Sequence, residues 1–243
     1  MTPLEKQYND ILTQSGQFTT AATYFTLVIA VFRVRYFNKT MWVFFAYIVA
    51  TIFVYTLEAV FIWSVKNYTS FWLPYLKRFD ITDTNFLEIL STLKSIILIA
   101  WFYKILLTEK WGKSIGYVGI MMTLFAIVDY ILITGYKASG NLMPTLVGFF
   151  LIITPMLYLW QLYRRDSRIS IYKIPYFWFS IALVIANLLG LFFYFVSEKM
   201  YETDFILYVK LSIARNVVTI LRYLVFAYGF WLAKYVRFIP KVS

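Results

Sequence analysis

The chain contains no cysteine and no histidine among its 243 residues. Without these side chains it cannot form disulfides, Cys or His metal sites, His-ligated haem, a cysteine nucleophile or a Ser-His-Asp triad. Most of the familiar redox and hydrolytic chemistry of membrane enzymes requires one of these groups. We therefore expect no metal, no cofactor and no catalytic residue of these kinds.

Charged residues are also scarce, at 14% of the chain, whereas 61% of the residues are hydrophobic and the mean hydropathy is +0.70. A soluble domain is about 45–50% apolar and could not cover so much apolar surface. The few charges are grouped between long apolar stretches, which is the pattern of a chain whose solvent is lipid. The sequence therefore predicts an all-α polytopic membrane protein with the lipid bilayer as its main partner.

Long apolar windows divide the chain into membrane spans, since a helix needs about 20 mostly apolar residues to cross the hydrocarbon. Seven windows of this size predict a single seven-helix transmembrane domain, at about residues 18–36, 41–63, 86–107, 115–136, 143–163, 175–197 and 205–235. The connections are short except for residues 64–85, whose aromatic piece at 70–75 is typical of a segment lying at the membrane interface. No linker and no second domain are expected.

Lysine and arginine are distributed unequally between the two sides of these spans. One side holds 13 of them: Arg33, Arg35, Lys39, Lys104, Lys110, Lys113, Arg164, Arg165, Arg168, Lys173, Lys234, Arg237 and Lys241. The other side holds 6: Lys6, Lys66, Lys77, Arg78, Lys137 and Lys199. By the positive-inside rule the first side is cytoplasmic, which places the N-terminus outside and the C-terminus in the cytoplasm.

The same rule explains the net charge of +11 without a nucleic-acid partner. Basic residues in a membrane protein first serve orientation, and no soluble domain is present to carry a basic face. The absence of cysteine favours a bacterial source. We therefore expect a multi-pass protein of a bacterial inner membrane that binds no nucleic acid.

Six charged residues fall within the predicted spans at more than three residues from either end, and a charge at the centre of a span costs about 2.5–3.5 kcal/mol even on the lenient insertion scale. They are Glu58, Lys94, Asp129, Lys210, Arg215 and Arg222. Four of them lie about 7–14 Å from the outer surface, counted at 1.5 Å per residue: Glu58, Lys94, Asp129 and Arg215. We expect these four to converge on one polar site that opens outward, where Arg215 meets Glu58 or Asp129.

Polar residues recur along two spans at helical i, i+3 and i+4 spacing. The last span carries Ser212, Arg215, Thr219 and Arg222, and the second carries Tyr47, Thr51, Tyr55 and Glu58. Two such stripes within lipid predict either an ion-pair lock that holds helices together or a ligand pocket built from the same groups. The excess of basic over acidic groups favours an anionic small ligand for the pocket.

Two other polar residues receive a structural interpretation. Glu88 follows Asn85 by three residues, which predicts a capping box at the start of the third span. Asn187 in the sixth span is expected to form a hydrogen bond across helices. Neither residue is therefore assigned to the site.

Short aromatic motifs mark several helix ends in the C-terminal two thirds of the chain. They are 101–104 (Trp-Phe-Tyr-Lys), 158–161 (Tyr-Leu-Trp-Gln), 174–178 (Ile-Pro-Tyr-Phe-Trp), and Arg215-Asn216 followed by 227–231 (Ala-Tyr-Gly-Phe-Trp). In these motifs the chain resembles a group of small uncharacterised seven-span bacterial membrane proteins that are often encoded near sensor kinases. Some of those relatives carry Tyr-His and an acidic residue at the start of the third span, of which residues 85–88 (Asn-Phe-Leu-Glu) keep only the acid.

The leading functional hypothesis is a non-enzymatic sensor or accessory subunit with an outward-facing pocket. It rests on the lack of a catalytic set and of a soluble output domain, so that a signal must leave through a cytoplasmic or membrane partner. The basic loop with Arg164, Arg165 and Arg168 is the predicted contact for that partner.

Two alternatives remain open. A transporter or channel for a small, anionic solute is favoured by charges within the spans, but no inverted repeat is evident. An intramembrane enzyme that uses Glu58 or Asp129 as acid or base comes third, because nothing in the sequence activates a nucleophile.

Overall fold

The computed structural model describes residues 3–81, 84–133, 142–164 and 170–238, and these ranges contain helices but no strand. The helices are α1 (Pro3–Arg33), η1 (Val34–Tyr36), α2 (Lys39–Asn67), α3 (Thr69–Phe79), η2 (Asn85–Leu87), α4 (Glu88–Leu106), α5 (Glu109–Val128), η3 (Asp129–Ile133), α6 (Leu142–Tyr163), η4 (Ile171–Lys173), α7 (Pro175–Thr203), α8 (Phe205–Trp231) and η5 (Leu232–Phe238). Seven helices in the described ranges are long and apolar enough to cross a membrane. This confirms the prediction of a multi-pass, all-α membrane protein with seven spans.

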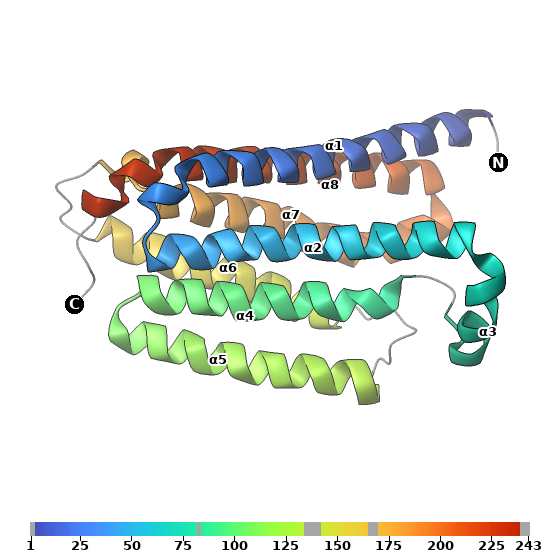
Figure 1. Cartoon of the computed structure of the whole chain (residues 1–243), viewed down its shortest axis with the longest axis horizontal. Coiled ribbons are helices and arrows are strands. Elements are labelled where there is room, and N and C mark those ends of the chain that lie inside the picture. Colours follow the sequence, from blue (N-terminus) through green and yellow to red (C-terminus); the bar gives the residue numbers. More distant parts are fainter. Residues whose placement is uncertain (1–2, 82–83, 134–141, 165–169, 239–243) are drawn as a thin grey trace.

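Six of the long helices close a ring, and α5 lies outside it. Contacts run from α1 to α2, then to α4, α6, α7 and α8, and return from α8 to α1. The remaining long helix, α5, packs along α4 at the edge of the bundle (Figure 1). Residues on α5 are therefore separated from the middle of the ring by α4.

The two ends of the bundle differ in charge. The end of the bundle at which α1, α4, α6 and α8 finish is called the basic end here, because most of the described loop lysines and arginines lie there. We call the opposite end, which carries the short helix α3, the α3 end. The first residues of α1 lie at the α3 end and η5 lies at the basic end (Figure 1). Which end faces the cytoplasm stays a prediction from the charge distribution.

Several helix starts follow directly from the local sequence. The Asn38 side chain accepts a hydrogen bond from the Met41 N–H (3.0 Å) at the start of α2, and Asp204 accepts one from the Leu207 N–H (2.9 Å) at the start of α8. Such caps satisfy first-turn N–H groups that lack a partner in the helix. Pro175 opens α7 at a position where its missing N–H costs nothing.

Two helices begin at other residues than the sequence pattern suggests. α1 begins at Pro3 rather than near residue 18, and its polar first turns continue along α8, where Asn216 Nδ2 donates to Ser15 Oγ (2.9 Å). A hydropathy window does not detect a helix that extends beyond its apolar part. Asn85 lies in the 3-10 turn η2, and Leu87 rather than Asn85 occupies the N-cap position of α4.

The aromatic segment between the second and third spans is the helix α3, which caps one end of the bundle (Figure 1). Its Phe71, Leu73 and Tyr75 side chains are exposed. Trp72 connects α3 to α2, because its Nε1–H donates to Ser64 Oγ of α2 (2.8 Å). An exposed aromatic face on a short helix at the end of a membrane bundle suits the predicted interfacial position.

Five buried phenylalanines meet inside the ring toward the basic end. This phenylalanine cluster consists of Phe44 (α2), Phe102 (α4), Phe179 (α7), Phe226 and Phe230 (α8), each 0% exposed. The Phe44 ring stacks on Phe179 with centroids 3.9 Å apart and meets Phe226 and Phe102 at 5.0 Å. The cluster therefore joins four helices of the ring at one level.

Small polar and glycine positions let neighbouring helices of the ring approach α8. A Cβ added to Gly229 of α8 would clash with the Phe179 ring of α7, so glycine is required for this packing. On the other side, the buried Thr26 hydroxyl of α1 donates to the Tyr223 carbonyl of α8 (2.8 Å). Both contacts hold α8 in the wall of the ring.

Candidate functional site

A polar cavity of about 230 Å³ lies inside the ring, between α2, α4, α6, α7 and α8. Its polar lining residues are Tyr47, Tyr55, Glu88, Ser91, Thr92, Lys94, Ser95, Asn187, Arg222 and Tyr223. Lys94 and Arg222 were predicted for the site from their place within the spans. The cavity brings these two cations together from helices that are more than a hundred residues apart in sequence.

Lys94 is held by neutral groups. Its Nζ donates to Thr51 Oγ1 at 3.0 Å and lies 5.1 Å from the centroid of the Tyr47 ring. The Thr51 hydroxyl can accept this bond because its own proton is donated to the Tyr47 carbonyl (2.8 Å). Lys94 forms no ion pair with a described carboxylate.

Arg222 is incompletely satisfied. Its Nη2 donates to the Tyr223 hydroxyl at 3.3 Å, and its Cζ lies 4.9 Å from the centroid of the same ring. Its Nε is buried and has no hydrogen-bond partner among the described residues, which also offer no carboxylate for an ion pair. A buried donor without a partner costs about 1–3 kcal/mol, so this nitrogen is available to an acceptor that enters the cavity.

Both cations lie deep in the bundle. Lys94 is twelve residues before the end of α4, and Arg222 is nine residues before the end of α8. At 1.5 Å per residue these positions lie about 18 Å and about 13 Å from the basic end of their helices. The hydrocarbon core is about 30 Å thick, so the two charges lie near its middle.

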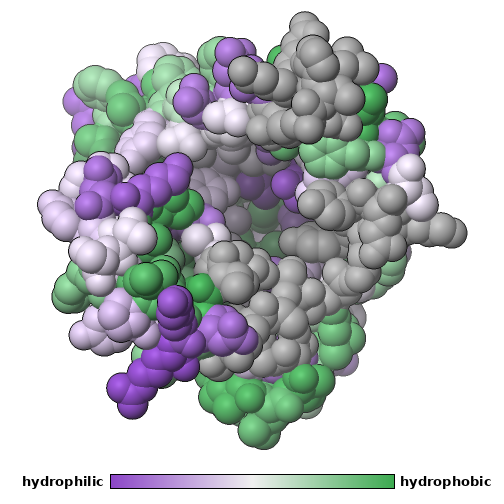
Figure 2. Space-filling view, turned by 90° about the vertical axis from the view of Figure 1, so that its right-hand side faces the viewer, coloured by the Kyte–Doolittle hydropathy of each residue, from purple (hydrophilic) through white to green (hydrophobic). Residues whose placement is uncertain are grey.

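The cavity opens toward the α3 end. Glu88 and Pro144, which line it, belong to the first turns of α4 and α6 at that end. Figure 2 looks onto this end and shows the surface hollowed at the centre of the bundle, with hydrophilic residues in the depth of the hollow. Toward the basic end the phenylalanine cluster follows, since Phe226 is one helical turn beyond Arg222. The cavity is therefore open at one end and closed at the other.

The predicted acidic residues are not part of this cavity. Glu58 accepts a hydrogen bond from the Thr84 hydroxyl (2.8 Å), which ties α2 to the segment before α4. Asp129 is buried, at 4% exposed, in η3 at the end of α5. Because α5 packs on the outer side of α4, an equal depth in the membrane does not bring Asp129 to the cavity.

The predicted pairing of Arg215 with Glu58 or Asp129 is wrong. Arg215 is exposed, and its guanidinium carbon lies 4.3 Å from the centroid of the Phe193 ring of α7. No ion pair joins any two of Glu58, Lys94, Asp129 and Arg215, so the predicted ion-pair lock is absent. The physical reason is lateral order: α8 packs between α1 and α7, whereas α5, which leads to Asp129, packs on α4 outside the ring.

Thr219 also lies outside the lining of the cavity. It is half-buried, and its hydroxyl donates to the Arg215 carbonyl of its own helix (2.9 Å). The predicted polar stripe of α8 therefore contributes only Arg222 to the cavity lining. Arg215 lies along the same side of the helix, because seven residues make nearly two turns.

The predicted partner loop is described only in part. Arg164 is exposed, and its guanidinium carbon lies 4.1 Å from the centroid of the Trp160 ring. Arg165 and Arg168 lie outside the described residues. The exposed Arg164 is accessible to a partner at the basic end.

Sequence reasoning did not assign five polar lining residues to the site: Glu88, Ser91, Thr92, Ser95 and Asn187. Glu88 was assigned to a capping box, and Asn187 was expected to bond across helices, whereas its Nδ2 donates to the Leu183 carbonyl of its own helix (2.7 Å). The signal for α4 was present, because the polar residues Glu88, Ser91, Thr92 and Ser95 follow helical i, i+3, i+4 and i+7 spacing. Asn187 had no such pattern around it.

The described residues contain no group of three or more His, Cys, Asp or Glu side chains that could hold a metal ion. Comparisons with protein-family models, with curated proteins and with solved structures find no match for the chain. The resemblance to proteins encoded near sensor kinases therefore stays a prediction. The function has to be argued from the cavity and its surroundings.

Proposed function

We propose that the chain is a non-enzymatic membrane sensor or accessory subunit that takes a small anionic ligand into the cavity. In this proposal the α3 end faces outward and the basic end faces the cytoplasm of a bacterium, with the chain in the inner membrane. One observation carries the proposal: Lys94 and Arg222 line one cavity near the middle of the bundle, and neither forms an ion pair with a described carboxylate.

Charge complementarity defines the class of ligand. A buried cation without a counter-charge raises the free energy of the fold, and a bound anion lowers it again. Glu88, in the first turn of α4, contributes one negative charge against the two positive ones. Arg215 adds a further positive charge along α8, about 10 Å nearer the α3 end, which favours the approach of an anion.

The size of the cavity limits the ligand. Its volume of about 230 Å³ is below the range of about 300–1,000 Å³ that is usual for drug-sized ligands. The charged donors that line the cavity are the Lys94 ammonium and the Arg222 guanidinium, and such groups bind carboxylate and phosphate oxygens well. We therefore expect a small carboxylate or phosphate rather than a large amphiphile.

The closed end of the cavity favours a sensor over a channel. A channel needs a continuous polar path, whereas the phenylalanine cluster stacks at 0% exposure between the cavity and the basic end. The same cluster supplies a route for the signal. Arg222 and Tyr47 lie one turn from Phe226 and Phe44, so an anion that draws Arg222 toward Lys94 shifts α8 against α2 and α4 at the level of the rings.

Calorimetric titration of the purified full chain tests the proposal, with acetate, succinate and inorganic phosphate as probes. We expect at least one of these anions to bind, and we expect Lys94→Gln and Arg222→Gln each to weaken it about tenfold or more. The reason is that a hydrogen bond to a charged group contributes about 1.5–3 kcal/mol. The matched control is Lys110→Gln, because Lys110 is exposed at the start of α5. An affinity that is equal in all four proteins, or no binding of any probe, contradicts the proposal.

A transporter is the second candidate, because a half-open polar site near the middle of the membrane is also what alternating access requires. Reconstitution into liposomes separates the two functions. Wild-type protein that carries the bound anion across the bilayer, with flux lost in Arg222→Gln, would overturn the sensor function and support the transporter.

A further inference from the structure

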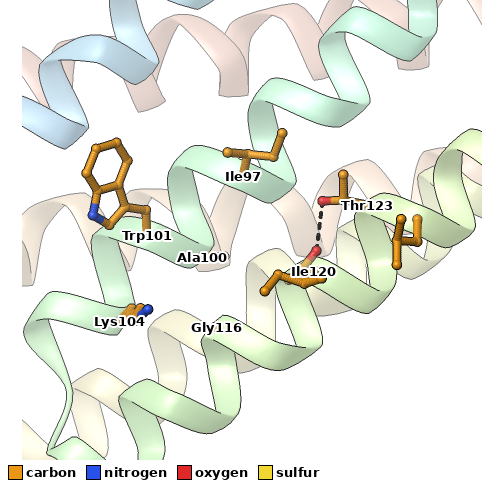
Figure 3. A pocket seen from close by; sticks show the side chains of 9 residues that line it. Ile97, Ala100, Trp101, Lys104, Gly116, Ile120 and Thr123 are labelled. Carbon is orange, nitrogen blue, oxygen red and sulfur yellow. Dashed lines mark hydrogen bonds between the residues drawn. The ribbon is translucent and has the colours of Figure 1, made fainter.

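A second, apolar cavity lies on the outside of the ring, in the groove between α4 and α5. Its volume is about 420 Å³, and Figure 3 shows it from close by. Small residues form its floor, since Ala100, Gly116 and Gly119 face one another across the two helices. A Cβ on Gly119 would lie 2.5 Å from the Ala100 Cβ, so the helices touch there and leave a shallow groove beside the contact.

Larger apolar side chains form the walls of this groove. Ile97 and Trp101 rise from α4, and Ile120 and Leu124 rise from α5; all four are exposed in the isolated chain. From Lys104 to Ile97 the groove runs seven residues along α4, or about 10 Å. Because both helices cross the membrane, this surface faces the acyl chains of the bilayer.

One charge stands at the end of the groove. Lys104 belongs to the last turn of α4, at the basic end, and its stem lies over Gly116, where an added Cβ would meet its Cδ at 3.3 Å and its Nζ at 3.8 Å. Lys104 forms no ion pair with a described carboxylate, whereas Lys113 nearby is paired with Glu109 (2.6 Å). The free ammonium is therefore positioned where the apolar groove meets the headgroup layer.

We propose that this groove binds one acyl chain of an anionic phospholipid, with the lipid phosphate at the Lys104 ammonium. Two parts of the site identify this ligand. The apolar groove, which runs along the helices, accepts an acyl chain, and the single free cation at its end selects a negative headgroup. The site is separate from the polar cavity, which lies on the inner side of α4. Its occupant anchors α5 to α4 along their shared face.

Quenching of Trp101 by brominated lipid tests this site, because the indole forms one wall of the groove. The full chain is reconstituted into phosphatidylcholine vesicles that contain phosphatidylglycerol, with bromine on the acyl chains of one lipid or of the other at equal mole fraction. The difference between wild type and Trp101→Phe isolates the contribution of Trp101. We expect brominated phosphatidylglycerol to occupy the groove about fivefold in preference to phosphatidylcholine, as one basic contact predicts.

Three variants decide the outcome. Lys104→Gln should remove the preference, and Gly116→Leu should lower quenching by both lipids because its side chain fills the groove. Lys110→Gln should keep the preference, since Lys110 is a lysine of the same end that does not line the groove. Equal quenching by both lipids in the wild type, or a preference that survives Lys104→Gln, would overturn the proposal. Loss of the preference in Lys110→Gln would also overturn it, because the attraction would then belong to the whole basic end.

Discussion

Replacing Lys94 by methionine tests whether the buried cation serves a ligand or the fold. Methionine is unbranched like lysine and one atom shorter, and it removes the ammonium together with its hydrogen bond to Thr51 (3.0 Å). Thr51 remains satisfied through the Tyr47 carbonyl. The loss is therefore limited to the value of one charge-assisted hydrogen bond, about 1.5–3 kcal/mol.

Removing the charge also stabilises the fold in two ways. The ammonium has no ion pair and shares its cavity with Arg222, so the substitution removes both a desolvation cost of several kcal/mol and a like-charge repulsion. Replacing buried ions by apolar residues of similar volume is often neutral or stabilising by about 1–4 kcal/mol. We expect a net stabilisation of about 1 kcal/mol in the absence of ligand, which corresponds to a rise in Tm of about 2–4 °C for a chain of this length.

Thermal unfolding of the purified chain in detergent, without added anions, measures this change. Lys110→Met serves as the control, because Lys110 is exposed and should leave Tm unchanged. A stability change of about 1 kcal/mol shifts Tm by about 2–4 °C, so a fall in Tm of about 2 °C or more with Lys94→Met would refute the reasoning. In that case the cation stabilises the fold, and the cavity would lose its main support as a ligand site.

Three further predictions concern the fold and the topology. Gly229→Ala should lower the unfolding free energy by about 1–3 kcal/mol, because the added methyl clashes with a buried ring, whereas Gly16→Ala has open space and should raise it by about 0.5–1 kcal/mol in the same denaturation assay. Thr26→Val should cost about 1 kcal/mol through the lost hydrogen bond to α8, and equal stability would show that the bond contributes nothing. A reporter fused after Ser243 should be cytoplasmic and one before Met1 external; both on one side would mean that the number of spans is miscounted.

Local information accounts for most of the fold that was predicted correctly. Each span needs only its own run of about 20 apolar residues, so hydropathy alone located all seven, with errors at the ends. The start of α7 at Pro175 was predicted from the sequence, whereas the caps of α2 and α8 are local features first seen in the structure. The helix α1 begins before the predicted span because its polar turns are stabilised by contacts with α8 rather than by lipid.

The candidate site was predicted only in part, because depth along a span is a local property and lateral position is not. Lys94 was predicted for the site from its depth and Arg222 from the polar stripe of the last span, and both line the cavity. Asp129 and Arg215 were expected there too, since a count of residues places them at a similar depth. Helix order decided otherwise: α5 packs outside the ring, and Arg215 lies against Phe193.

The sequence by itself determined that this chain is a membrane bundle of seven helices, and which charges lie within it, because lipid acts on each segment separately. Only the tertiary structure decided that six helices form a ring, that the ring holds two cations without an ion pair, and that a phenylalanine cluster closes one end. These features depend on which faces of distant helices meet. That choice is made by side-chain packing between helices, such as the Phe179 ring against Gly229, and not by the apolar content of any one span.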